Sequence, residues 1–236
     1  MVSGKRIKGR TLKRQVRELL QQPERETALN GICRYPLKQV VNPLIACLSD
    51  LNTDIKWHAV TAMGTVVPML AGTAMEPARV IMRRLIWSLN SESGGIGWGA
   101  AEAMGEIMAC HRQLAVEYAV ILLSYIRKGE SYIENVALQT GVLWALGRLA
   151  QVRPAFIRSE AELLIPFAAS SHPKHRALAA WAAHGVSSNV LDPSLKELLR
   201  DDIPVQIYAG WHRVCCTIRQ LAANGIPLAA LSQKTP

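Results

Sequence analysis

Apolar residues recur along most of the chain at intervals of three and four, the period of a helix that buries one face. Between residues 75 and 90 the positions with this spacing are Val80, Ile81, Leu85 and Leu89. The stretch 114–125 repeats it with Leu114, Ala115, Tyr118, Ile121, Leu122 and Tyr125. The Asn-Gly pair that is typical of β-hairpin turns occurs only at residues 30–31 and 224–225. The pattern therefore predicts an all-α chain.

Turn-forming residues divide the predicted helices. The breaks fall at residues 73–77, 90–97, 128–134, 170–173 and 191–193. Asp54 is predicted to be the N-cap of the helix that contains Trp57, because a short acceptor side chain can bond the first free amides of a helix. Pro43 and Pro68 fall inside helical patterns and should kink or shorten those helices. Four other prolines stand where the first turn of a helix tolerates them, namely Pro154, Pro173, Pro193 and Pro204.

A short motif recurs through these helices. Trp57-His-Ala-Val-Thr-Ala-Met-Gly64 and Trp98-Gly-Ala-Ala-Glu-Ala-Met-Gly105 share Trp, Ala and Ala-Met-Gly at the same offsets, from position 57 to position 98. A third copy ends at Gly147, a fourth at Gly185, and a weaker fifth begins at residues 210–211. A period of about forty residues is typical of two-helix repeat units. The glycines that close the first four copies are predicted to let neighbouring helices approach closely.

The segments Asp54–Gly64 and Gly97–Ile107 resemble the second helix of HEAT-like repeats, especially the short bacterial kind that is also found in phycobilisome lyases. The resemblance covers roughly residues 35–222. It implies a right-handed α-solenoid of about five two-helix repeats. We therefore expect a basic N-terminal helical arm or cap at residues 1–34, a repeat domain at 35–223 and a C-terminal tail at 224–236.

The net charge of +9 is concentrated at the N-terminus. Residues 1–40 hold ten Lys and Arg against three Glu, whereas the other 196 residues hold 17 basic and 15 acidic side chains. Such an arm can contact nucleic acid, an acidic partner or anionic lipid, or it can simply be a solvated face. Leu12, Val16, Leu19 and Leu20 form an apolar stripe with which it could cap the first repeat. The basic residues of the arm are Lys5, Arg6, Lys8, Arg10, Lys13, Arg14 and Arg17.

The five cysteines are odd in number and show no CxxC spacing, which favours a reducing compartment and the cytoplasm. We expect one thiol or both of the Cys215-Cys216 pair to be buried. The longest apolar run, residues 114–126, contains Glu117 and is shorter than the roughly 20 residues that span a bilayer. No membrane span is therefore predicted.

Residues 95–100 fit the G-x-G-x-x-G/A pattern of a dinucleotide loop. That loop requires a preceding strand, but residues 81–89 are predicted to be helical, so we interpret the glycines as an inter-helix turn and expect no cofactor. The histidines at 172, 175, 184 and 212 lack the convergent ligand set that zinc requires, so no metal is expected and these side chains are predicted to be exposed or to cap helices. No nucleophile with a general base emerges, and catalytic residues are not predicted.

Six tryptophans are numerous for a chain with two Phe, and they either fill the core between repeats or form a stacking surface for bases or a partner's side chains. Residues three before and one after the repeat glycine share one helical stripe. In the second and third copies these are Glu102, Glu106, Trp144 and Arg148. We predict this stripe as the binding face.

Three functions are open at this point. The leading hypothesis is a non-enzymatic scaffold that binds a protein or peptide on the concave face of the solenoid, because extended curved surfaces are what solenoids offer. The alternative is nucleic-acid binding or DNA repair, since HEAT-like bacterial alkylpurine DNA glycosylases are similar in architecture, length and charge. A further alternative, a bilin lyase-like chaperone, is implied by the resemblance alone.

Overall fold

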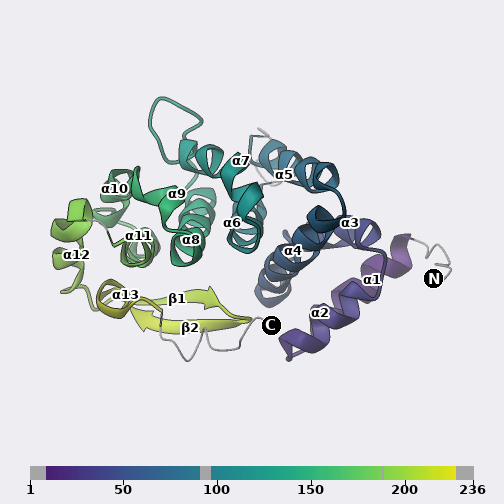
Figure 1. Ribbon diagram of the computed structural model, residues 1–236. Coiled ribbons are helices and arrows are strands. Elements are labelled where there is room, and N and C mark those ends of the chain that lie inside the picture. The colour runs from purple at the N-terminus through teal and green to yellow at the C-terminus, as the bar shows by residue number, and fades with distance from the viewer. Residues whose placement is uncertain (1–8, 91–96, 188, 227–236) are drawn as a thin grey trace. The chain divides into compact units, whose positions relative to one another are not determined.

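The computed structural model describes residues 9–90, 97–187 and 189–226 (Figure 1). Helices dominate these residues, which confirms the predicted class, an all-α helical-repeat solenoid. The chain divides into two compact units, unit 1 (Met1–Cys110) and unit 2 (His111–Pro236). The elements of unit 1 are α1 (Gly9–Leu19), α2 (Arg25–Cys33), α3 (Leu37–Cys47), α4 (Thr53–Thr73), α5 (Met75–Leu89) and α6 (Ala100–Cys110).

Unit 2 holds more numerous and shorter elements. In chain order they are α7 (Arg112–Ser124), α8 (Val136–Val152), α9 (Ala155–Arg158), η1 (Ala161–Leu164), α10 (Ile165–Ala168), α11 (Pro173–Val186), η2 (Asn189–Leu191), α12 (Asp192–Leu198), β1 (Pro204–Ala209), β2 (His212–Thr217) and α13 (Ile218–Asn224). None of the helices in the described part of the chain is long and apolar enough to cross a membrane.

In unit 1 the basic helix α1 packs against α2 and α3, and α3 packs along α4. The apolar stripe predicted on this helix is buried at Leu12, Val16 and Leu20. Burial of these side chains removes apolar surface from water and holds α1 on the first repeat. The described part of the basic arm is therefore a packed helix with its charged side outward.

The helix α4 begins at a cap that sequence reasoning misplaced. The side chain of Asn52, not that of Asp54, is the N-cap, and its Oδ1 accepts bonds from the backbone N of Asp54 (2.9 Å) and of Ile55 (3.3 Å). The prediction for Asp54 is wrong because Asn and Asp are equally good N-cap residues, and Asn52 and Asp54 both lie where α4 begins. Pro43 and Pro68 lie inside α3 and α4, as predicted.

Second helices of consecutive repeats pack on each other within each unit, α4 on α6 and α8 on α11. A Cβ on Gly147 would lie 2.4 Å from Cε3 of Trp181, and one on Gly185 would lie 2.9 Å from the carbonyl carbon of Ala150. Both glycines therefore permit the close helix contact that the repeat predicts. A Cβ on Gly64 would meet the flexible side chain of Glu106 at 2.5 Å.

The predicted fifth repeat is a β-hairpin instead. Strands β1 and β2 pair antiparallel, with Ala209 opposite His212, so that Gly210 and Trp211 form a two-residue turn. Both turn residues have positive φ, 59° and 84°, as a type I′ turn requires. Pro204 begins β1 and not a helix. The prediction is wrong here because the Trp-His pair at 211–212 mimics the one at 57–58.

Candidate functional site

Two members of the predicted binding stripe lie on α6 in unit 1, and both are buried. Glu102 is 5% exposed, and its Oε1 accepts a bond from Nζ of Lys56 on α4 at 2.7 Å. Lys56 also lies 5.1 Å from the centre of the Trp57 ring. The side chain of Glu106 packs over Gly64. The ion pair between Lys56 and Glu102 joins α4 and α6, the second helices of two repeats, so it stabilises their packing.

The other two members lie on α8 in unit 2. Trp144 is 4% exposed, and its Nε1 donates to the backbone oxygen of Tyr208 at 3.0 Å. Its ring lies 6.0 Å from that of Trp181 and 6.4 Å from that of Tyr208. Arg148 is half-buried. The hairpin thus lies against Trp144, and a binding role for Glu102, Glu106, Trp144 and Arg148 remains a prediction.

The basic arm is only partly within the described residues. Lys5, Arg6 and Lys8 lie outside them. Arg10, Lys13 and Arg14 are exposed on α1. Arg17 donates two bonds to Asp50, from Nε at 2.8 Å and from Nη2 at 3.2 Å. These bonds hold the pKa of Asp50 below its usual value, and the charge of Lys13 adds to the effect.

A concavity with polar walls lies between α1 and α3 in unit 1. It has a volume of about 600 Å³, and we call it the basic groove. It is lined by Gly9, Leu12, Lys13, Lys38, Gln39, Asn42 and Pro43. Of the described residues that line it, none carries a negative charge. The groove therefore combines two ammonium groups, two amides and an apolar floor.

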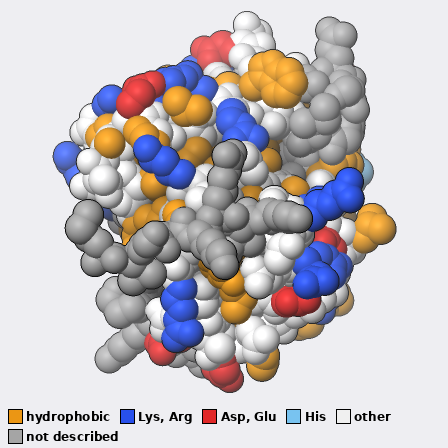
Figure 2. Space-filling view, turned by 90° about the vertical axis from the view of Figure 1, so that its right-hand side faces the viewer, with side chains coloured by type: hydrophobic (Ala, Val, Ile, Leu, Met, Phe, Trp, Pro, Cys, Tyr) orange, Lys and Arg blue, Asp and Glu red, His pale blue; other side chains and the backbone are white. Residues whose placement is uncertain are grey.

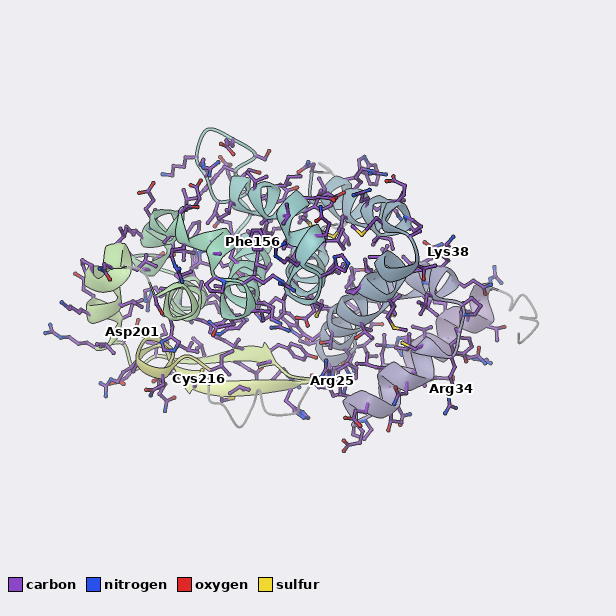
Figure 3. The ribbon with its side chains drawn as sticks, viewed as in Figure 1. Arg25, Arg34, Lys38, Phe156, Asp201 and Cys216 are labelled. Atoms are coloured by element: carbon purple, nitrogen blue, oxygen red, sulfur yellow. The ribbon has the colours of Figure 1, made fainter. Side chains whose placement is uncertain are left out.

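Helix geometry explains why these side chains converge. Lys38 and Asn42 are four residues apart on α3, so they project from the same side, and Figure 3 labels Lys38 on this helix. Nη1 of Arg84 on α5 donates to Oδ1 of Asn42 at 2.8 Å. A third cation therefore flanks the groove. Figure 2 shows Lys and Arg side chains on this side of the molecule, interspersed with hydrophobic side chains and with Asp and Glu.

A groove with this lining can bind anions. Ammonium and guanidinium groups donate charge-assisted hydrogen bonds to carboxylates and phosphates. The Gln39 and Asn42 amides can both donate and accept, which suits a peptide backbone. Sequence reasoning identified Lys13 but missed Lys38, Gln39, Asn42 and Arg84. The i,i+4 pair Lys38–Asn42 was the available signal, but its meeting with α1 and α5 depends on tertiary packing.

Other candidate chemistry is sparse in the described structure. Within the described ranges, no group of three or more His, Cys, Asp and Glu side chains could hold a metal ion. His175 is buried, contrary to the expectation of exposed or capping histidines, and burial lowers its pKa. All five cysteines lie in the described ranges and none of them forms a disulfide; of the pair on β2, Cys216 is buried and Cys215 is exposed. Glycines 97 and 99 precede α6 and follow α5, as an inter-helix turn should, while Gly95 lies outside the described residues.

No protein-family model matches the chain, and no curated protein matches it. Among solved structures it is similar to two engineered proteins, one at 16% identity with a TM-score of 0.49 over 81% of this chain and 92% of the other. The second has 17% identity and a TM-score of 0.48 over 80% and 89%. A designed armadillo repeat protein in complex with the peptide (KR)4 has 16% identity and a TM-score of 0.48 over 80% and 92%.

These likenesses are too distant to carry an argument about function. A similarity to phycobilisome lyases is not shown by the comparisons. The packing of the helices within each unit supports the helical-repeat architecture. The basic groove is the feature that indicates a function.

Proposed function

We propose that the protein is a non-enzymatic scaffold that binds a short acidic segment of another protein in the basic groove. The observation that carries this proposal is the lining of the groove. Lys13 and Lys38 face a concavity of about 600 Å³, and no described acidic side chain lines it. Clefts lined by one sign of charge focus the field and raise the local concentration of the opposite charge.

The size and surroundings of the groove favour a short segment over a long polyanion. On α1, Nε of Arg14 lies 3.6 Å from Oε1 of Glu18. On α5, Nη2 of Arg83 lies 2.5 Å from Oε1 of Glu76. Each of these ion pairs occupies an arginine that would otherwise be available to a phosphate backbone running along the helices. A peptide of a few acidic residues needs only the groove, where the side-chain amide of Gln39 can form hydrogen bonds with its backbone.

Nucleic-acid binding is the second candidate, because α1 exposes Arg10, Lys13 and Arg14 on one helix. Such a stripe can neutralise phosphates without sequence preference. A bilin-chaperone role is supported only by the repeat resemblance, and bound bilin would give visible absorbance.

The test is the fluorescence anisotropy of a labelled peptide of alternating Glu and Ser, titrated with the full chain. The charge reversal Lys13→Glu/Lys38→Glu should weaken binding by about tenfold or more, since it replaces two attractive contacts with repulsive ones. The matched control is Lys128→Glu/Lys196→Glu, which reverses two exposed lysines in unit 2. It should leave the affinity within about twofold of the wild-type value.

Labelled single-stranded and duplex DNA form the second arm of the experiment. Loss of peptide affinity only in the groove variant supports the proposal. Equal loss in both variants would mean that net charge, and not the groove, governs binding. DNA that binds more tightly than the peptide, with a steep dependence on salt, would favour the nucleic-acid function instead.

A further inference from the structure

Helix α5, whose Arg84 flanks the basic groove, also carries an exposed tryptophan. The side chain of Trp87 is 68% exposed, although tryptophan is highly buried on average. Trp144, Trp181 and Trp211, by comparison, are all at most 4% exposed. Packing therefore accounts for those three tryptophans but not for Trp87.

The position of Trp87 connects it to the groove. Val80, Arg84 and Trp87 follow the i, i+4, i+7 spacing of one helical stripe, and Val80 is 44% exposed. Arg84 in the middle of this stripe donates to Asn42, which lines the groove. Trp87 is thus one helical turn from the cation that flanks the groove.

We infer that the segment bound in the basic groove carries a large apolar or aromatic side chain next to its acidic residues, and that this side chain packs on Trp87. The inference rests on the proposed function and specifies its partner. Tryptophan and arginine are the residues most often enriched among those that dominate binding energy at interfaces. The charges of Lys13, Lys38 and Arg84 attract the acidic part, and Trp87 offers apolar surface to the neighbouring residue.

The arrangement also gives specificity. An acidic segment without an apolar residue would engage the cations but would leave Trp87 in water. An apolar segment without acidic residues would leave Lys13 and Lys38 uncompensated. Only a segment with both features matches the surface, so the groove should discriminate among acidic segments by their apolar content.

The experiment compares two labelled acidic peptides of equal charge and length, one with a central Leu and one with Ser at that position. Both are titrated with the full wild-type chain and with Trp87→Ala, Trp98→Ala and Lys13→Glu/Lys38→Glu. Trp98→Ala is the matched control, because Trp98 is 37% exposed in the same unit but lies in the turn before α6. Circular dichroism confirms that each variant is folded.

The Leu peptide should bind the wild-type chain about tenfold more tightly than the Ser peptide. Trp87→Ala should abolish this advantage and leave the Ser peptide unchanged, while Trp98→Ala alters neither. If both peptides bind equally and need the lysines but not Trp87, the inference is overturned and the proposed function stands. If the charge reversal affects neither peptide, the proposed function itself fails.

A third probe separates a peptide from a nucleic acid. A labelled single-stranded oligonucleotide could stack bases on an exposed tryptophan. If Trp87→Ala weakens the binding of the oligonucleotide but not that of either peptide, Trp87 stacks on bases and the inference is overturned. Oligonucleotide binding that is insensitive to Trp87→Ala, together with the loss of the Leu advantage, supports it.

Discussion

The replacement Gly147→Ala probes the close contact between α8 and α11. The added Cβ would lie 2.4 Å from Cε3 and 2.8 Å from Cζ3 of Trp181. The Trp181 ring is 1% exposed and has the Trp144 ring 6.0 Å away, so it has little room to withdraw. Because carbon atoms prefer about 3.5 Å or more, one of the helices or the ring has to move by about 1 Å.

Two opposing contributions set the magnitude. Alanine in a helix interior is favoured over glycine by about 1 kcal/mol. Overpacking a buried site typically costs up to about 3 kcal/mol. We therefore expect Gly147→Ala to lower the free energy of unfolding of unit 2 by about 2 kcal/mol. With a urea m-value of about 2 kcal/mol/M, the midpoint should fall by about 1 M.

The assay is urea unfolding followed by circular dichroism and by tryptophan fluorescence, so that separate unfolding of the two units is detected. Gly72→Ala is the matched control, because Gly72 lies near the end of α4 and, apart from its chain neighbours and the backbone of its own helix, no atom lies within 4 Å of an added Cβ. It should stabilise unit 1 by about 0.5 kcal/mol. A Gly147→Ala protein that is as stable as the wild type would refute the proposed close packing.

Three further predictions concern stability. Asn52→Ala removes the N-cap of α4 and should lower the free energy of unfolding, measured by thermal unfolding, by about 1 kcal/mol. A decrease below about 0.3 kcal/mol would show that the cap is unimportant. Lys56→Met leaves Glu102 buried without its cation and should cost about 3 kcal/mol, most of which Lys56→Met/Glu102→Leu should restore in the same assay. Burial lowers the pKa of His175 below its ordinary 6.5, so the unfolded chain takes up a proton first. Stability should therefore fall as pH drops below about 6.5, and a His175→Asn protein with the same pH dependence would contradict this.

The repeat architecture was predictable because packing leaves a local trace in the sequence. Close approach of α8 and α11 requires a residue without a side chain at Gly147, and the same requirement recurs at Gly185. The apolar stripe of α1 likewise follows from the helical period, since Leu12 and Val16 share one face. Both features leave a pattern that can be recognised within a single helix, even where the packing partner is distant in the chain.

The hairpin could not be predicted in this way. Its turn is Gly210-Trp211 and not Asn-Gly, and Trp211 adopts a φ of 84° that a bulky side chain rarely takes. Burial of Trp211 to 2% exposure, a tertiary effect, accompanies this conformation. The binding stripe shows the same limitation, because helical spacing places Trp144 on a face without indicating that Tyr208 covers it.

The basic groove could not be predicted from the sequence for a related reason. Lys13 belongs to α1, Lys38 and Asn42 to α3, and Arg84 to α5. The charge count drew attention to the N-terminal run, but only the packing of α1 on α3 brings Lys13 and Lys38 to one concavity. Arg84 joins them through its bond to Asn42, a residue more than forty positions away in the chain.

Photocrosslinking can show directly whether an acidic peptide binds in the basic groove. An acidic peptide that carries a photoreactive group is bound to the full chain, irradiated, and its attachment sites are mapped by mass spectrometry. We expect crosslinks in α1, α3 and α5, and we expect them to be lost in Lys13→Glu/Lys38→Glu. Crosslinks confined to residues 111–236, or crosslinks that persist unchanged in that variant, would contradict it.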